Sequence, residues 1–526
     1  MLRRSAPLLV ALALAACQPS VPKNPSTVDY AAFDPLNAVF PVPNELVLQF
    51  AATVPGAQGE LLREFAAQGG FPYDQVLSVA IDLVREDLSD PTAPARSAPP
   101  LDLTSIVPCT AQTAPGSCNL MVLDALAVPP ADPYAAVAAS YAAGTSSGTL
   151  SLTRIDAGGH PIPWRAGGNY IVALRGGTSG VKSTDGGQLN ASVTMYALLF
   201  SPRAELPDDT ARQLQDAYQP VFAAVENRGF PKSDIAVLAT FPVAPASTWV
   251  KADPTTGDMP LPSDFLFDLS TGHVSTLLDP LIPNISTLDG FSTTAMVFGQ
   301  TSGPIQASTI RSPAARGVYL YDLATPAAPA LVPDVVDFLT AGTPPVYVAV
   351  TSGPTVQGGL TTVIGLQPAV GVGTPSAPGA VPPTQISLPP LKEKTRYAVV
   401  VTNGVLDAAG QPLSRTTLGT IVTLASPICL PDGCSDPASV FFPGISTLLG
   451  VSAVDAAGLE SQRKALQPVL AALEAPLGCS AAADPLACVK GKVAFGYTFR
   501  TQTVTDLTLQ LPMLPYAGGA FGIKPG

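Results

Sequence analysis

The stretch Tyr397-Ala-Val-Val-Val-Thr-Asn-Gly-Val-Leu-Asp407-Ala-Ala-Gly410-Gln-Pro-Leu413 is the starting point for the fold, because a version of it occurs earlier in the chain. The earlier version runs Tyr170-Ile-Val-Ala-Leu-Arg-Gly-Gly and then, after a short insertion, Asp185-Gly-Gly-Gln-Leu189. In both versions tyrosine and β-branched residues favour a strand, and glycine permits the turn that follows. We expect Asp185 and Asp407 to accept hydrogen bonds from the backbone of their own turns.

Three more pairs of segments repeat in the same order along the chain. They are 41–48 with 260–267, 214–226 with 462–474, and 235–241 with 493–499. The first pair begins with Pro-x-Pro and predicts an extended strand at the start of each unit. The second pair has apolar residues at helical spacing and predicts a helix, kinked at Pro220 in one copy and at Pro468 in the other. The third pair predicts a short closing strand, so the ordered series indicates a tandem duplication.

The composition indicates the fold class. The 526 residues are too many for one hydrophobic core, and 57 prolines and 45 glycines separate short runs of Val, Leu and Thr. We therefore expect a mainly β fold of tandem Ig-like β-sandwich units, each closed by an amphipathic helix and a short strand. Unit one is expected over 29–247, unit two over 248–504 and a C-terminal tail over 505–526. Within the units we expect a short helix in the Ala-rich segment 131–143 and a long surface excursion over 359–385.

The first residues indicate export to the cell envelope. Two arginines follow Met1-Leu, an apolar run too short to span a bilayer comes next, and Leu14-Ala-Ala-Cys17 ends it. This order resembles the signal peptide and lipobox of bacterial lipoproteins. We expect residues 1–16 to be removed, the thiol of Cys17 to be lipidated and residues 17–28 to form a tether. The expected location is the outer membrane, with the N-terminal lipid as the membrane contact.

The charge of the chain argues against one class of partner. The formal net charge is −12, with 27 Lys and Arg against 39 Asp and Glu. Nucleic acid binding requires Lys and Arg to neutralise phosphates, so we expect no nucleic acid partner. The simplest interpretation of the negative charge is that the acidic residues lie on a solvent-exposed surface.

The cysteines indicate a disulfide framework. The chain has 7 cysteines, and those after Cys17 form three close pairs. The pairs are Cys109 with Cys118, Cys429 with Cys434, and Cys479 with Cys488. An even number in an exported chain indicates disulfides, and among the possible connectivities we predict pairing of nearest neighbours. We expect no metal and no cofactor, because Cys-x-x-Cys is absent and the chain has 2 histidines.

Four segments are informative together: Pro262-Ser-Asp264, 285–294, 397–413 and 497–502. They resemble the N-terminal, non-catalytic region of bacterial virulence-factor-type extracellular lipoprotein lipases. In that family this region contains bacterial Ig-like modules, and an α/β-hydrolase domain follows it. The resemblance implies the scaffold and the compartment. Few residues follow Gln502, so we expect the hydrolase domain itself to be missing here.

The sequence contains one weak motif for hydrolase chemistry. A serine hydrolase needs Gly-x-Ser-x-Gly at a strand-to-helix elbow, together with an acid and a histidine. The match Gly144-Thr-Ser146-Ser-Gly148 precedes a strand-like segment, which is the reverse of that context. We interpret it as a polar turn and expect no catalytic residue at Ser146, His160 or His273. Trp164 and Trp249 are expected to be packing aromatics.

These patterns together predict a non-catalytic, lipid-anchored envelope protein with an adhesive, scaffolding or accessory role. The expected partner is an envelope protein or a glycan. Two alternatives stay open. One is a lipase-family protein with residual or partner-dependent lipid-ester hydrolysis. The other is a carbohydrate-binding sandwich, which a face rich in exposed aromatic residues would favour.

Overall fold

The structure is a computed structural model that describes most of the chain between Thr27 and Val504. The described residues are 27–34, 39–52, 56–87, 96–114, 116–128, 131–206, 209–253, 258–280, 282–341, 348–352, 359–368, 371–373, 385–387, 390–429 and 453–504. The predicted signal peptide, Cys17, nearly all of the tether, Cys434 and the tail therefore lie outside the described residues. The chain divides into two compact units, residues 1–54 with 62–245 and residues 55–61 with 246–526.

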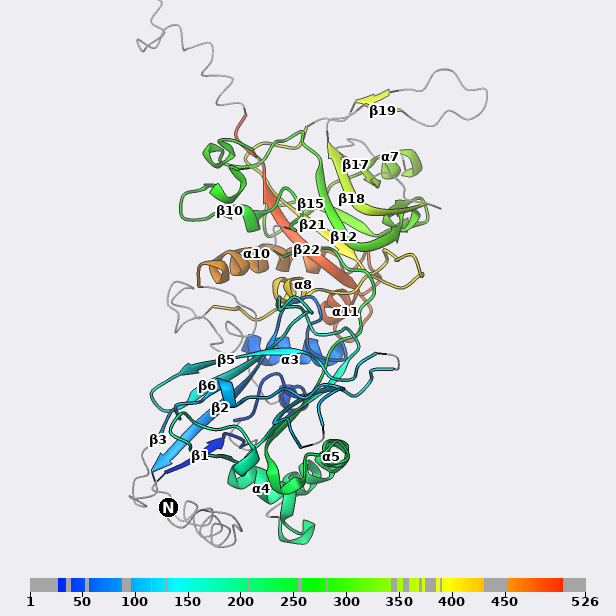
Figure 1. The fold of residues 1–526 in the computed structure, drawn as a ribbon. Coiled ribbons are helices and arrows are strands. Elements are labelled where there is room, and N and C mark those ends of the chain that lie inside the picture. The colour runs from blue at the N-terminus through cyan, green and yellow to red at the C-terminus, as the bar shows by residue number, and fades with distance from the viewer. Residues whose placement is uncertain are drawn as a thin grey trace, which may run out of the picture. The chain divides into compact units, whose positions relative to one another are not determined.

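Unit 1 contains two main sheets (Figure 1). The larger sheet has the order β5-β6-β2-β1-β8, with β3 also paired to β2, and the smaller has the order β4-β7-β9. The strands are β1 (Thr27–Ala31), β2 (Ser78–Asp87), β3 (Arg96–Ser97), β4 (Leu120–Asp124), β5 (Val137–Ala143), β6 (Gly148–Arg154), β7 (Asn169–Arg175), β8 (Leu189–Asn190) and β9 (Ile235–Pro242). The helices are α2 (Glu45–Gln49), α3 (Gly56–Ala67), α4 (Val193–Phe200) and α5 (Asp209–Glu226), and α3 belongs to this unit only from Leu62 onward.

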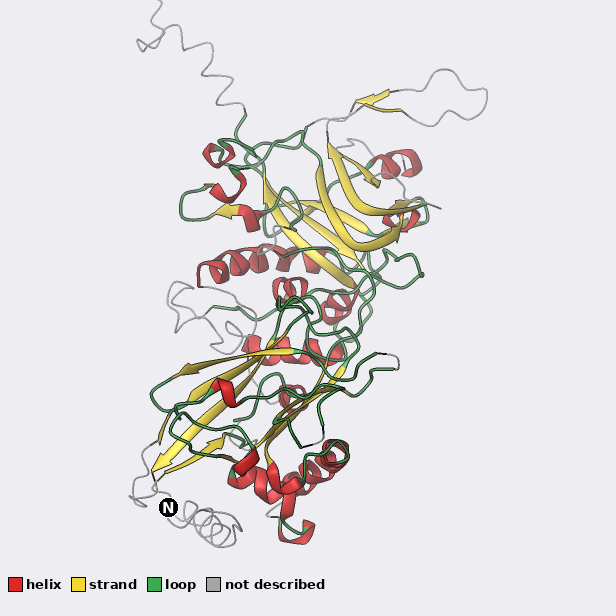
Figure 2. Ribbon diagram, viewed as in Figure 1, coloured by secondary structure: helices red, strands yellow, loops and turns green. Residues whose placement is uncertain are grey.

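Unit 2 contains a four-stranded sheet of order β16-β15-β21-β22, a three-stranded sheet of order β12-β18-β17 and small hairpins. Its strands are β10 (Phe267–Asp268), β11 (His273–Val274), β12 (Val297–Gln306), β13 (Arg311–Ser312), β14 (Ala315–Arg316), β15 (Val318–Asp322), β16 (Ala330–Leu331), β17 (Val348–Ser352), β18 (Leu360–Pro368), β19 (Gly371–Gly373), β20 (Gln385–Ser387), β21 (Arg396–Thr402) and β22 (Val493–Arg500). Its helices are α6 (Ala307–Ile310), α7 (Val335–Ala341), α8 (Thr417–Thr423), α10 (Ala453–Ala472) and α11 (Pro485–Lys492). Strand residues outnumber helix residues, so the fold is mainly β (Figure 2).

One three-stranded arrangement occurs in both units with the same antiparallel register. In unit 1 β7 lies between β4 and β9, and in unit 2 β21 lies between β15 and β22. The matching rows across the strands are Asp124, Tyr170 and Phe241 in unit 1, and Asp322, Tyr397 and Phe499 in unit 2. A register shift interrupts the second pairing at the same end of each sheet, at Arg175 and at Thr402. The two repeated tyrosines of the sequence therefore occupy equivalent places in their sheets.

A long helix precedes the last strand of each arrangement. The segment 214–226 is the C-terminal part of α5, and 462–472 belongs to α10. Pro220 and Pro468 lie inside these helices. Their apolar stripes are buried: Tyr218, Phe222 and Val225 in α5, and Leu466, Val469 and Leu470 in α10. Burial of such a stripe is the main source of stability for an amphipathic helix.

The turns after the repeated tyrosines lead into a second pair of matching helices. The carboxylate of Asp407 accepts hydrogen bonds from the N–H groups of Ala409 and Gln411, as predicted for its own turn. Further along, Ser192 caps the N-terminus of α4 and Thr416 caps that of α8. Each side-chain oxygen accepts a hydrogen bond from the third residue after it, which satisfies a free N–H of the helix.

Three predictions about local structure are wrong. The segments after Pro-x-Pro are helical turns and not strands, because Asn44 and Ser263 accept hydrogen bonds from the N–H groups of Leu46 and Phe265. The Ala-rich segment 131–143 contains the strand β5, since pairing with β6 outweighs the helix propensity of alanine. The predicted excursion 359–385 contains β18, which pairs with both β12 and β17.

Candidate functional site

The repeated tyrosine of unit 1 holds a turn against its sheet. The Tyr170 hydroxyl accepts a hydrogen bond from the Arg165 N–H at 3.1 Å, and the Arg165 guanidinium donates to the Asp124 carboxylate at 2.7 Å. The Tyr170 ring stacks on Phe241, with centroids 5.4 Å apart, and Trp164 packs edge-on against both rings. Trp164 is 1% exposed, which confirms the prediction that it is a packing aromatic.

Unit 2 repeats this arrangement with a lysine in place of the arginine. The Tyr397 hydroxyl accepts a hydrogen bond from the Lys392 N–H at 2.9 Å, and the Lys392 ammonium donates to the Asp322 carboxylate at 2.7 Å. The Tyr397 ring stacks on Phe499 at 5.5 Å. In both units the acid, the basic residue and the tyrosine are hydrogen-bonded to protein groups, so we assign them a structural role.

A buried charged cluster lies between α10 and the sheet of unit 2. The Arg396 guanidinium donates to the Asp264 carboxylate at 2.7 Å and to the Thr498 hydroxyl at 2.9 Å. Arg500 approaches the same carboxylate from 3.6 Å. Burial lowers the pKa of Arg396, and the charge of Asp264 partly offsets that effect. We call Asp264, Arg396, Gln462, Thr498 and Arg500 the unit 2 polar cluster.

The unit 2 polar cluster contains atoms that have no hydrogen-bond partner among the described residues. These atoms are Oδ1 of Asp264, Nε2 of Gln462 and Nε of Arg500. Asp264 is 5% exposed and Gln462 1%. Buried polar groups usually find a partner, so these unpaired atoms distinguish the cluster from the surrounding core. Both guanidiniums pair with the Asp264 carboxylate.

Unit 1 has a corresponding cluster that is less charged. The Thr240 hydroxyl donates to the Glu45 carboxylate at 3.3 Å, as Thr498 does to Asp264 in unit 2. Asn169 stands where unit 2 has Arg396, in line with the matching registers of β7 and β21. The position is therefore polar in both units, but only unit 2 has an arginine at this position of the strand.

An ion cluster secures the first described strand of unit 1. Arg85 binds Asp29 with two hydrogen bonds of 2.6 and 2.8 Å, and it binds Asp185 at 2.5 and 3.0 Å. The Ser183 hydroxyl also donates to Asp29, which is 4% exposed. These hydrogen bonds raise the pKa of Arg85 and lower that of Asp185. The sequence predicted that Asp185 accepts a hydrogen bond within its own turn, and it accepts one from the Gly187 N–H. The sequence did not predict that Asp185 also binds Arg85.

Two predicted disulfides are present. Cys109 is bonded to Cys118, and Cys479 is bonded to Cys488. Cys429 is also disulfide-bonded, but its predicted partner Cys434 lies outside the described residues.

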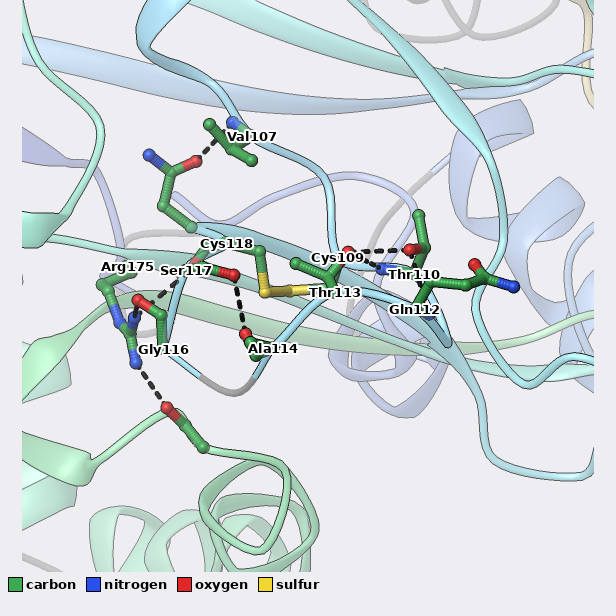
Figure 3. The surroundings of a disulfide bond; sticks show 12 residues. Val107, Cys109, Thr110, Gln112, Thr113, Ala114, Gly116, Ser117, Cys118 and Arg175 are labelled. Carbon is green, nitrogen blue, oxygen red and sulfur yellow. Dashed lines mark hydrogen bonds between the residues drawn. A yellow bond between two sulfur atoms is a disulfide. The ribbon is translucent and has the colours of Figure 1, made fainter.

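Arg175 connects the first disulfide loop to the end of α5. Its guanidinium donates to the carbonyl groups of Gly116 and Cys118 at 2.9 and 3.2 Å, as Figure 3 shows, and to the Gly229 carbonyl. It lies over the Phe230 ring, 4.6 Å from the centroid, and is 3% exposed. The disulfide loop and the turn after the helix are thus held by one buried cation. No sequence signal indicated this role, because Arg175 follows an apolar run.

The hydrolase motif lies on an exposed hairpin turn. Ser146 is exposed between β5 and β6, and the Gly144 N–H donates to the Ser147 carbonyl to close the turn. This is not the strand-to-helix elbow that a serine nucleophile needs. His160 is exposed in another turn, 3.3 Å from Asp156, and His273 belongs to the hairpin β10–β11 of unit 2. Trp249 is half-buried.

The described residues hold neither a metal-binding cluster nor a membrane-spanning helix. They contain no group of three or more His, Cys, Asp or Glu side chains arranged to hold a metal ion. No helix in the described ranges is long and apolar enough to cross a bilayer. In comparisons with known proteins, no family model matches the chain and no curated protein is significantly similar to it.

Proposed function

We propose that the chain is a non-catalytic envelope lipoprotein made of two copies of one Ig-like module, with an adhesive, scaffolding or accessory role. The observation that carries this proposal is the disulfide between Cys109 and Cys118. Both cysteines are 5% exposed and belong to the core cluster that also contains Phe222 and Phe230. Disulfides persist in oxidising compartments, so a core that contains one is suited to the envelope and not to the cytosol.

The proposal of two copies of one module is supported by the matching strand registers and caps. Tyr170 and Tyr397 make the same hydrogen bond and the same ring stack. Ser192 and Thr416 cap matching helices. The same cross-strand rows, turns and helix caps occur in the same order in both units. A duplication explains this directly, whereas independent origins would require each feature to arise twice.

A scaffolding role is supported by the positions of two aspartates, a tryptophan and a serine. Asp185 and Asp407 bind the backbone of turns, and Trp164 lies in a core. Ser146 is on an exposed turn with no elbow. Each of these side chains therefore has a structural role or lies in a setting that does not activate it.

Lipidation is tested by substitution of Cys17. We expect the wild-type protein to fractionate with membranes and to carry acyl chains detectable by mass spectrometry of the N-terminal peptide. The Cys17→Ala variant is expected in the soluble fraction without acyl chains. Recovery of wild-type protein without acyl chains would contradict the lipoprotein proposal.

Absence of ester hydrolysis is tested with the full mature chain and lipid esters of short and long acyl length. We expect the wild type, Ser146→Ala and His273→Ala to give the same background rate. A wild-type rate that either substitution abolishes would favour the lipase-family alternative.

The glycan alternative is tested at α4. Phe200 is the one exposed aromatic side chain among the described residues, and its ring centroid lies 4.8 Å from that of Tyr196. Glycan binding that Phe200→Ala removes would favour the carbohydrate-binding alternative, and equal binding by both proteins would count against it.

A further inference from the structure

The strand β5 ends the larger sheet of unit 1 and, among the described strands, pairs with β6 alone. Just beyond the strand, the Ile155 N–H donates to the Ala136 carbonyl, and at the turn the Gly144 N–H donates to the Ser147 carbonyl. Hydrogen-bonded pairs alternate along an antiparallel ladder, so even-numbered residues of β5 bond to β6. The N–H and C=O groups of the odd-numbered residues point away from β6. We call these residues, Val137, Ala139, Tyr141 and Ala143, the β5 edge.

The β5 edge has no backbone hydrogen-bond partner among the described residues. Proteins usually protect such an edge with charges, proline, a bulge or a covering element. The sequence Val-Ala-Ala-Ser-Tyr-Ala-Ala has no charge and no proline, and its register with β6 runs without a shift. The strand is 7 residues long. An edge of this kind is suited to accept another strand.

The last strand of the three-stranded sheet in unit 2 differs in this respect. Val348, the first residue of β17, forms a parallel bridge with Asp334, and α7 packs against the same strand. The edge of β17 is therefore partly covered by its own unit. Residues 103–105 pack against β5 as well, and the Tyr141 hydroxyl donates to the Pro99 carbonyl. No described backbone group, however, forms a hydrogen bond with the β5 edge.

The side chains of β5 are suited to a second copy of the same strand. Ala138, Ser140 and Ala142 are exposed on one face of the strand. Their order, Ala-Ser-Ala, is the same in both chain directions, as a symmetric antiparallel pair requires. In an antiparallel pair with a two-fold axis at Ser140, serine would face serine and Ala138 would face Ala142 of the second copy. No like charges would oppose one another, although the chain has a net charge of −12. The β5 edge would gain about eight backbone hydrogen bonds in this register.

We propose that two copies of this protein associate by antiparallel pairing of their β5 edges, which joins the two sheets across a two-fold axis. A symmetric pair of this type is the commonest form of protein dimer. The proposal goes beyond the envelope role and does not depend on the lipid anchor, so it is testable on the mature chain in solution.

Cysteine cross-linking tests the register. Residues directly opposite in a non-hydrogen-bonded pair have Cα atoms about 4.5 Å apart, and a disulfide needs roughly 4.4–6.8 Å. We expect Ser140→Cys to form a covalent dimer under mild oxidation, seen on a non-reducing gel. Ala142→Cys is the matched control on the same exposed face, because its two copies would be about 14 Å apart. We expect at least a tenfold lower yield for it.

Charge substitution tests the association itself. Ser140→Lys would place two ammonium groups opposite each other at the axis, so we expect the concentration for half-dimerisation to rise at least tenfold in sedimentation experiments. Ala142→Lys faces an alanine and is expected to have a smaller effect. Circular dichroism checks that both variants fold. The proposal would be overturned if the wild-type protein stayed monomeric at all concentrations. Equal cross-linking of the two cysteine variants would overturn it as well.

Discussion

The ring of Tyr397 stacks on the ring of Phe499, with centroids 5.5 Å apart and planes inclined by 19°. Tyr170 and Phe241 do the same in unit 1, at 5.4 Å and 22°. Each tyrosine also accepts a backbone hydrogen bond from the residue five positions before it. The sheet, the preceding turn and the last strand of each unit therefore meet at one side chain.

Removal of either hydroxyl should destabilise its unit. Tyr397→Phe keeps the ring stack but removes the hydroxyl that accepts the partly buried hydrogen bond from the Lys392 N–H, which costs about 0.5–1.5 kcal/mol. Tyr170→Phe should have the same effect through Arg165. Urea unfolding measures the change. Tyr134→Phe is the control, because the Tyr134 hydroxyl has no hydrogen-bond partner among the described residues. Equal stability of all three variants would contradict the structural role of the hydroxyls.

Gly290 should tolerate no side chain. A Cβ there would lie 2.7 Å from the backbone of Thr501 and Gln502, next to the parallel bridge of Phe291 with Thr501. Gly290→Ala should lower the free energy of unfolding by about 1–3 kcal/mol, the usual effect of overpacking. Gly458→Ala is the opposite case, because Gly458 lies inside α10 with open space around its Cβ position. That variant should gain about 0.5–1 kcal/mol. If Gly290→Ala were as stable as the wild type, the backbone at Thr501 and Gln502 would have to move away from the added methyl group, and the prediction would be wrong.

The two described disulfides should stabilise the chain separately. Each closes a loop with a sequence separation of 9. Replacement of Cys109 and Cys118 by serine should cost about 2–4 kcal/mol, and replacement of Cys479 and Cys488 should cost a similar amount. The pairs lie in different units, so the effects should add in the fourfold variant, as measured by urea unfolding. Strong non-additivity would indicate that the units do not unfold separately.

The network of Arg311, Arg316, Asp334 and Asp337 should make unit 2 sensitive to acid. Arg311 binds Asp334 at 2.6 and 3.1 Å, and Arg316 binds it at 2.9 Å. Burial alone would raise the pKa of Asp334, but the hydrogen bonds from the arginines hold it below its ordinary value. A carboxyl whose pKa is lowered in the folded state stabilises the protein above the unfolded pKa of about 3.9, and this stability is lost as the pH falls through the lower folded pKa.

The acid sensitivity is measured as the free energy of unfolding between pH 7 and pH 2. Asp334→Asn should be less stable at pH 7 by about 3 kcal/mol, because it leaves a buried arginine partly uncompensated, and should lose less stability on acidification. Asp216→Asn is the control, since Asp216 pairs with Arg203 at an exposed site and should change neither quantity measurably. Parallel pH curves for wild type and Asp334→Asn would exclude the network as the acid-sensitive element.

Local patterns predicted several elements well and others poorly. The apolar spacing around Pro220 and Pro468 placed α5 and α10, and the β-branched runs placed β7 and β21. The Ala-rich segment became β5 because pairing with β6 decides the conformation of a short uncharged run. The segments after Pro-x-Pro became helical turns because Asn44 and Ser263 provide caps, a signal that was present in the sequence but not used.

The sequence by itself determined the elements whose causes are local: helical spacing, strand runs, turn residues such as Asp407, and cysteines close enough to pair with a neighbour. Only the tertiary structure decided which distant polar groups meet. Arg85 binds Asp29 and Asp185, which are 56 and 100 positions away, and Arg396 binds Asp264 at a separation of 132. Such contacts depend on the register of strands and on burial, because a one-residue shift would turn each side chain to the other face of its sheet.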